Sequence, residues 1–202
     1  LVRLLLFYEI YLDMIIKIFP VMALWLGIMN IAKVSGLLGK FSKLLYPILK
    51  KLFPEIPKEH ESLSLIASNI IANMFGLGNA ATPFGLKAME SLQTLNPDKE
   101  RASNSQIMFL CLHAGGLTLI PVSIIAMRAS LGSENPTDIF LPCMIATFAA
   151  TLAAMIFVSL YQKINLLQPV VIAYVGAISA IIGLLVVYLV HLTKEGVDNF
   201  SM

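Results

Sequence analysis

Residues 73–83 read NMFGLGNAATP, and this stretch decides how the chain around it folds. Its two glycines are natural stops for a helix that arrives from the preceding residues. Thr82 followed by Pro83 is a typical helix start, because a hydroxyl caps the first turn and proline suits the first helical position. Residues 62–95 are therefore predicted to form a helix, a break and a second helix.

The composition predicts a protein that is embedded in a membrane. Apolar residues make up 58% of the chain and charged residues 13%. Soluble domains are about half apolar and about a quarter charged, so too few charges are present here to cover a water-facing surface. The net charge of +2 is small, and no basic tract is interleaved with aromatic residues. A nucleic-acid polymer is therefore not expected as a partner.

A helix that crosses the hydrocarbon core needs about 20 mostly apolar residues. The second of the candidate spans is interrupted by a histidine, by two glycines and by Pro121, whereas the last two are uninterrupted. Residues 193–202 form a polar tail. The candidate spans are Ile18–Ala32, Gln106–Met127, Asp138–Leu160 and Pro169–Leu192.

Residues 35–53 have a different pattern, in which apolar residues recur at helical spacing. Lysines punctuate them at positions 40, 43, 50 and 51. This pattern is typical of an amphipathic helix that lies at a membrane interface. We therefore expect an all-α integral membrane fold with about four spanning helices, one amphipathic interfacial helix and one re-entrant, broken helical hairpin at 62–95.

Lysine and arginine residues near the span ends predict the orientation of the chain. The lysine-rich segment 33–58 is assigned to the cytoplasm. If the hairpin at 62–95 dips into the membrane and returns, then Lys99, Arg101 and Lys163 all fall on the same side. The loop at 129–137, which has no lysine, falls outside. This agreement favours a re-entrant hairpin over two short crossings.

The break at 76–83 is the strongest candidate site. Unpaired peptide groups at helix ends cannot face lipid, so they are buried in protein or line a watery cavity, as in the broken helices of transporters. A helix N-terminus after Thr82 would favour an anionic or polar group, and a nearby lysine, which can also pair with Glu90, would neutralise an anion. A tight turn whose polar groups are satisfied by neighbours would require the same glycines and proline. The candidate ligand-binding residues here are Asn69, Asn73, Gly76, Gly78, Asn79, Thr82 and Lys87.

A second candidate site follows the same order of glycine, threonine and proline, and resembles a weak internal repeat of the first. Glycines that let helices pack closely, with Pro121 as a kink, account for the pattern equally well. Its histidine should face the bundle interior, as a neutral hydrogen-bond partner of Asn69 or Asn73 in preference to a proton-linked group. The candidate residues here are His113, Gly115, Gly116 and Thr118.

The sequence contains no metal-ligand set, phosphate loop or catalytic pair. We therefore expect neither an enzyme nor a metal or cofactor site. Cys111 and Cys143 both lie in apolar stretches and are interpreted as packing residues.

The run at 73–89 resembles the signature of the spore maturation protein A family, within the nucleoside-recognition or Gate domain superfamily. Four further stretches agree with this resemblance. The pair His113-Ala114 stands where the family pattern leads us to expect an Asn-Thr-like pair. The family's first membrane helix is not matched, so the chain is expected to be a fragment. The agreeing stretches are Trp25–Met29, Leu52–Pro54, Leu117–Pro121 and Asn135–Thr137.

The resemblance implies a multi-pass protein of the bacterial inner (cytoplasmic) membrane. Residues 1–193 would form the A-like Gate membrane domain, and 194–202 a polar tail or linker towards a B-like half of a fused protein. The implied function is half of a transporter for a small polar or anionic solute, with the lipid bilayer and a B-like domain or subunit as partners. The alternative is a non-transporting scaffold for an envelope maturation complex.

Overall fold

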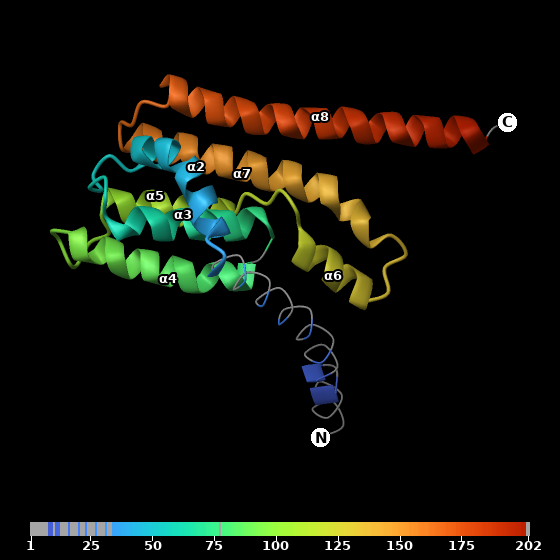
Figure 1. The fold of residues 1–202 in the computed structure, drawn as a ribbon, viewed down its shortest axis with the longest axis horizontal. Coiled ribbons are helices and arrows are strands. Elements are labelled where there is room, and N and C mark those ends of the chain that lie inside the picture. The colour runs from blue at the N-terminus through green and yellow to red at the C-terminus, as the bar shows by residue number, and fades with distance from the viewer. Residues whose placement is uncertain are drawn as a thin grey trace.

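The computed structural model describes residues 34–76 and 78–200, with a few scattered positions before residue 34. The elements in this part of the chain are all helical (Figure 1). Most of the predicted span at Ile18–Ala32 lies outside the described residues. The helices are α2 (Leu37–Leu52), α3 (Glu61–Met74), α4 (Gly78–Leu95), α5 (Asn104–Gly115), α6 (Val122–Ser130), the short 3-10 helix η1 (Pro136–Ile139), α7 (Phe140–Tyr161) and α8 (Pro169–Phe200).

Two helical stretches in the described part are long and apolar enough to cross a membrane, Pro136–Tyr161 and Pro169–Tyr188. They agree with the last two predicted spans. Within an apolar 18-residue part of each stretch, only 22% and 11% of the residues are buried in the chain, so most of these side chains are left to lipid or to another protein. Helix α8 continues to Phe200, and so the backbone stays helical through most of the segment predicted as a polar tail.

The predicted span at 106–127 is two helices instead of one. Helix α5 has 12 residues and α6 has 9, and both are too short to cross the hydrocarbon core. The chain leaves the helical conformation after Gly115 and returns to it at Val122. The described residues therefore contain two of the predicted spans as continuous helices, and the total of about four stays a prediction.

The amphipathic helix predicted at 35–53 is confirmed as α2, but the C-terminal part of its apolar face is covered by protein. Leu49 and Leu52 are buried, and α2 packs on α3 and, through fewer contacts, on α8. The hydroxyl of Tyr174 on α8 donates to the carbonyl of Leu44. The part of that face around Leu49 and Leu52 is not free to insert into lipid, whereas Leu44 is exposed. The position of α2 at a membrane surface stays a prediction.

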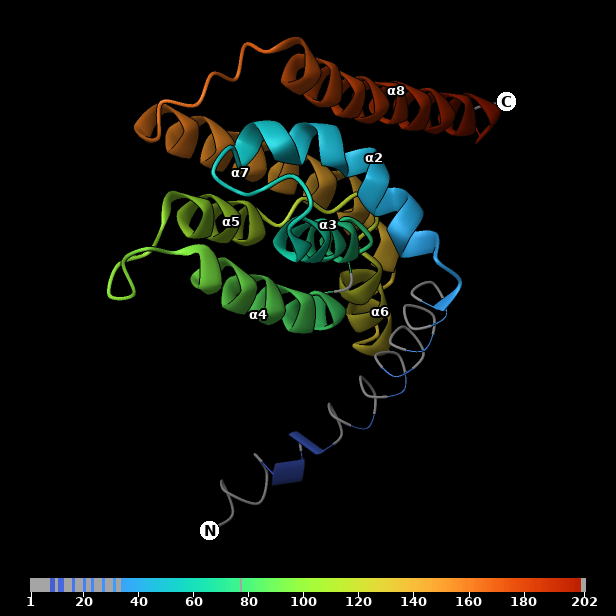
Figure 2. The same ribbon diagram turned by 60° about the vertical axis from the view of Figure 1, so that its left-hand side comes forward.

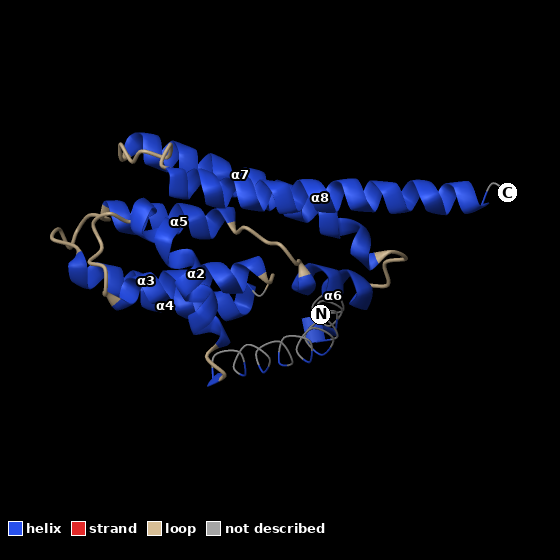
Figure 3. Cartoon of the chain, turned by 45° about the horizontal axis from the view of Figure 1, so that its top comes forward, coloured by secondary structure: helices blue, strands red, loops and turns tan. Residues whose placement is uncertain are grey.

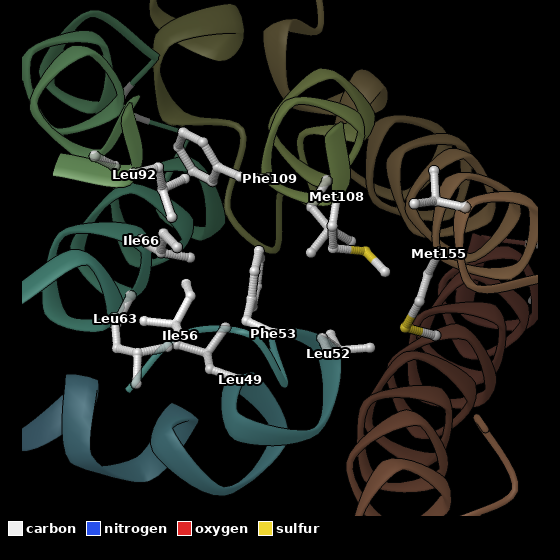
Figure 4. Close-up of a cluster of buried hydrophobic side chains, with 14 residues drawn as sticks. Leu49, Leu52, Phe53, Ile56, Leu63, Ile66, Leu92, Met108, Phe109 and Met155 are labelled. Carbon is white, nitrogen blue, oxygen red and sulfur yellow. The ribbon is translucent and has the colours of Figure 1, made fainter. Parts of the chain in front are cut away.

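Buried side chains from α2, α3, α4, α5 and α7 form one apolar cluster (Figure 4). Phe53, the residue after α2, is only 1% exposed and points into this cluster. Around it lie Ile66 of α3, Leu92 of α4 and Met108 of α5 (Figure 4). The cluster holds the α3–α4 hairpin against the rest of the bundle.

Three connections lie together at one end of the bundle: α2–α3, α4–α5 and α7–α8 (Figure 2). Glu55 accepts from Asn104 Nδ2 at 2.7 Å, and Gln162 Nε2 donates to the Asn104 carbonyl at 2.8 Å. By sequence these connections carry Lys58, Lys99, Arg101 and Lys163. The α6–α7 connection lies at the opposite end (Figure 3). The assignment of the first end to the cytoplasm stays a prediction.

Candidate functional site

The two predicted breaks meet inside the bundle. The carbonyl of Met74, the last residue of α3, accepts from the N–H of Leu119 at 2.8 Å and from the N–H of Ile120 at 3.0 Å. Both donors belong to the non-helical segment between α5 and α6. We call this meeting point, residues 74–76 with 116–123, the junction. It brings together the two candidate sites that the sequence placed 40 residues apart, counted from Asn73 to His113.

Gly76 allows the two segments of the junction to approach closely. Its φ of +67° lies in the left-handed region that favours glycine. A Cβ at this position would lie 2.3 Å from the carbonyl oxygen of Ile120 and 2.9 Å from the amide nitrogen of Val122. The Gly76 carbonyl accepts from Ser123 Oγ at 2.6 Å. The carbonyls of Met74 and Gly76 in this turn therefore both find hydrogen-bond donors in the segment between α5 and α6 or at the start of α6.

The second half of the junction is anchored on α7. Gly116 closes α5 in the left-handed conformation, with a φ of 56°, as is common at helix C-termini. The N–H of Thr118 donates to Thr147 Oγ1 at 3.1 Å. A Cβ on Gly115 would lie 2.9 Å from the Cα of Thr151, so this glycine lets α5 pack closely on α7. The packing interpretation is thus confirmed for Gly115.

The predicted helix start at Thr82 and Pro83 is wrong, because α4 begins at Gly78. The alanines at 80 and 81 are strong helix formers and extend the helix towards its N-terminus. Pro83 is the sixth residue of α4, and it removes the N–H that would otherwise bond to the Asn79 carbonyl. Thr82 is exposed, and its hydroxyl donates back to the Gly78 carbonyl at 3.1 Å instead of capping the helix.

Beside the junction, a polar cluster joins three helices. Asn69 of α3 is fully buried, and its Nδ2 donates to the Ala81 carbonyl of α4 at 2.8 Å. The half-buried Asn73 donates through Nδ2 to Asn69 Oδ1 at 3.3 Å. His113 of α5 places Nδ1 at 3.0 Å from Asn69 Oδ1 and at 3.3 Å from Asn73 Nδ2. The predicted hydrogen bond between His113 and an asparagine is confirmed for Asn69.

The other candidate residues lie apart from this cluster. Gly78 is exposed, with open space where a Cβ would be. Lys87 and Glu90 are both exposed on α4 and form no ion pair with each other in the described part of the chain. The side chain of Asn79 lies outside the described residues. Among the groups that the structure describes, no set of acidic, histidine and cysteine side chains could hold a metal ion.

Two further residues of the site, Thr147 and Gly85, were not predicted from the sequence. Ser123 and Thr147 supply the hydroxyls that hold the junction. Gly85 of α4 faces Asn69, since a Cβ there would lie 3.0 Å from Asn69 Nδ2. Single hydroxyls and glycines are common within membrane helices, so only the tertiary contacts distinguish these residues.

An apolar cavity of about 100 Å³ lies under the junction. Its walls include Met74 and Leu117 of the junction and Leu112 of α5. A more open, polar cleft of about 490 Å³ lies away from the site, between Glu55 and the α4–α5 connection. The junction therefore borders apolar space, where unsatisfied polar groups would be costly.

Two comparisons with known proteins identify the family. The family model for Gate, described as nucleoside recognition, matches residues 15–131. Spore maturation protein A of Bacillus subtilis (strain 168) is 48% identical over 136 residues, which cover 67% of this chain and 69% of that protein. No solved structure matches the chain. The chain therefore belongs to the Gate, or nucleoside recognition, family and within it to the relatives of spore maturation protein A.

Proposed function

We propose that this chain is one half of a membrane transporter whose solute site is the polar cluster at the junction. The observation that carries the proposal is the meeting of two helix breaks through the Met74 carbonyl, next to the fully buried Asn69. Broken helices that meet within a bundle provide polar groups at a depth where a continuous helix offers none. Membership of the Gate family supports the same function.

The solute is a small polar or anionic molecule, and the second half is a B-like domain or subunit in the bacterial inner membrane. Two features support a partner or lipid around the chain. Helices α7 and α8 leave most of their apolar surface uncovered. Helix α8 packs on the rest of the chain mainly through α2 and only slightly through α7. An uncovered apolar surface of this kind is stable only in lipid or against another protein.

Flux through reconstituted vesicles tests the proposal. Vesicles containing this chain with a B-like partner are loaded with radiolabelled uridine, which the family description suggests, or with inorganic phosphate. The variant Asn73→Ala should abolish flux while the complex still assembles. Ser68→Ala is the matched control, because among the described residues the partly exposed Ser68 hydroxyl bonds only to the Ser64 carbonyl. Unaltered flux in Asn73→Ala would refute this site.

A non-transporting scaffold is the second candidate, and one observation favours it. The carbonyls of Met74 and Gly76 are both already hydrogen-bonded within the chain, so these groups need no solute. In addition, Lys50 and Lys51 on α2 form no ion pair in the described part of the chain and are exposed. A scaffold predicts that Lys50→Gln with Lys51→Gln abolishes co-purification of envelope partners. Junction variants that still assemble would then be tolerated.

A further inference from the structure

The contacts of Asn69 fix which way its side-chain amide points. Its Nδ2 lies 2.8 Å from the Ala81 carbonyl, which can only accept, so this atom must be the amide nitrogen. Asn69 Oδ1 therefore faces His113 and Asn73. Because Asn69 is fully buried, water cannot substitute for these partners. The cluster thus contains one acceptor of known position.

That acceptor decides where His113 carries its proton. Its Nδ1 lies 3.0 Å from Asn69 Oδ1, a distance that requires a hydrogen on Nδ1. A protonated Nδ1 cannot also accept from Asn73 Nδ2, although the two atoms are 3.3 Å apart. Asn73 Nδ2 instead donates to Asn69 Oδ1. This is the one arrangement in which each donor of the cluster has an acceptor.

The second ring nitrogen of His113 is then left for a ligand. Among the described residues no group hydrogen-bonds to Nε2, and this atom is not one of the buried atoms without a partner, so it is accessible. The helices packed on α5 carry few charges: Glu61 on α3, and Lys87 with Glu90 on α4, all exposed, and none on α7. No carboxylate in the described part of the chain is hydrogen-bonded to the ring to stabilise an imidazolium.

We propose that His113 is the solute-contacting residue of the site and presents an unprotonated Nε2 as a hydrogen-bond acceptor. Asn69 is a positioning residue, which holds the proton on Nδ1. The solute group that sits against His113 is then an uncharged donor, such as a hydroxyl or an N–H. This inference rests on the proposed function, and it narrows a polar or anionic solute to one that carries a hydrogen-bond donor.

Nitrogen NMR of the full chain in lipid vesicles tests the position of the proton. The histidines are labelled with ¹⁵N, and the His113 resonances are assigned by their loss in His113→Gln. At neutral pH, Nδ1 should be protonated and Nε2 unprotonated. Asn69→Ala should move the proton to Nε2, whereas Asn73→Ala should leave it on Nδ1, because Asn73 is not the acceptor. A neutral ring protonated on Nε2, or a charged ring, in the unaltered protein would overturn the proposal without any need for the variants.

Added probes test the solute class on the same sample. Glycerol, an uncharged probe with hydroxyl donors, should move the Nε2 resonance upfield and leave Nδ1 in place. Sulfate, an anion without a hydrogen-bond donor at neutral pH, should leave both resonances unchanged. A shift of Nε2 with sulfate, or no shift with either probe, would overturn the solute-contacting role of His113. The proposed function is tested separately, in the vesicle assay. If Asn73→Ala abolishes flux but glycerol does not shift the Nε2 resonance, the transport proposal stands and the solute-contacting role of His113 is refuted.

Discussion

The carbonyl oxygen of Met74 lies 2.8 Å from the amide nitrogen of Leu119, and this backbone hydrogen bond joins the end of α3 to the break after α5. Because both groups belong to the main chain, the bond does not depend on either side chain. It depends on how closely the two segments approach, and Gly76 sets that distance.

Replacing Gly76 with alanine should separate the two breaks. The new Cβ would clash with the Ile120 carbonyl at 2.3 Å, and alanine disfavours a φ of +67°. We expect the free energy of unfolding in detergent micelles to fall by about 1–3 kcal/mol from overpacking, with about 1–2 kcal/mol more from the left-handed conformation. Gly78→Ala is the control, since open space surrounds that position. Equal losses in the two variants would contradict the junction.

Gly115→Ala should push α5 away from α7. The added Cβ would lie 2.9 Å from the Thr151 Cα and 3.0 Å from its Oγ1, and the first of these atoms cannot move without its helix. The expected loss of unfolding free energy is about 1–3 kcal/mol. Gly183→Ala on α8 meets no atom within 4 Å and should change the melting temperature little. If Gly115→Ala has the same melting temperature as Gly183→Ala, then α5 and α7 do not pack closely at Gly115.

Asn69→Ala should destabilise the chain more than any other single change in the polar cluster. It removes the acceptor of His113 and the donor to Ala81 from a fully buried position. Breaking a buried hydrogen bond and leaving its partner unsatisfied costs about 1–3 kcal/mol. The comparison is with Ser68→Ala, where a partly exposed hydroxyl loses a bond to its own helix. Denaturant unfolding measures the free energy of unfolding of both variants, and Asn69→Ala should lose more of it than Ser68→Ala.

The open end of the α3–α4 hairpin should depend on a buried pair of serines. Ser62 Oγ lies 2.8 Å from Ser91 Oγ, and Ser91 also donates to Glu61 Oε1 at 3.1 Å. Each serine-to-alanine change should cost about 0.5–1.5 kcal/mol. The double variant should cost less than the sum, because contacting residues couple. Strict additivity in this double-mutant cycle would mean that the two hydroxyls do not interact.

The sequence predicted the elements of this fold better than it predicted their partners. The two uninterrupted spans were recognised because a run of about 20 apolar residues is typical of a helix long enough to cross a bilayer. Helix α2 was recognised by its period, but periodicity shows only that one face is apolar and not what covers it. The helix was therefore assigned to a membrane interface, although Leu49 and Leu52 of its apolar face pack inside the protein.

Within the site, side-chain chemistry was predictable and backbone geometry was not. The pairing of His113 with Asn69 follows from the cost of a lone polar group among apolar neighbours. The bond between Met74 and Leu119 has no side-chain signature, so no residue pattern could reveal it. The start of α4 was misplaced because Pro83 was assigned as the first helical residue. In the structure the helix begins at Gly78, and Pro83 is its sixth residue.

The tight fit at Gly76 also limits how this protein can diverge. The Cβ of any other residue would clash with the Ile120 carbonyl, so substitutions at position 76 are not tolerated while that contact exists. We expect homologues that carry a larger residue there to show a compensating change around Ile120 or Val122. Descendants that have lost their solute would still keep the glycine, because the requirement arises from folding and not from selection on cargo.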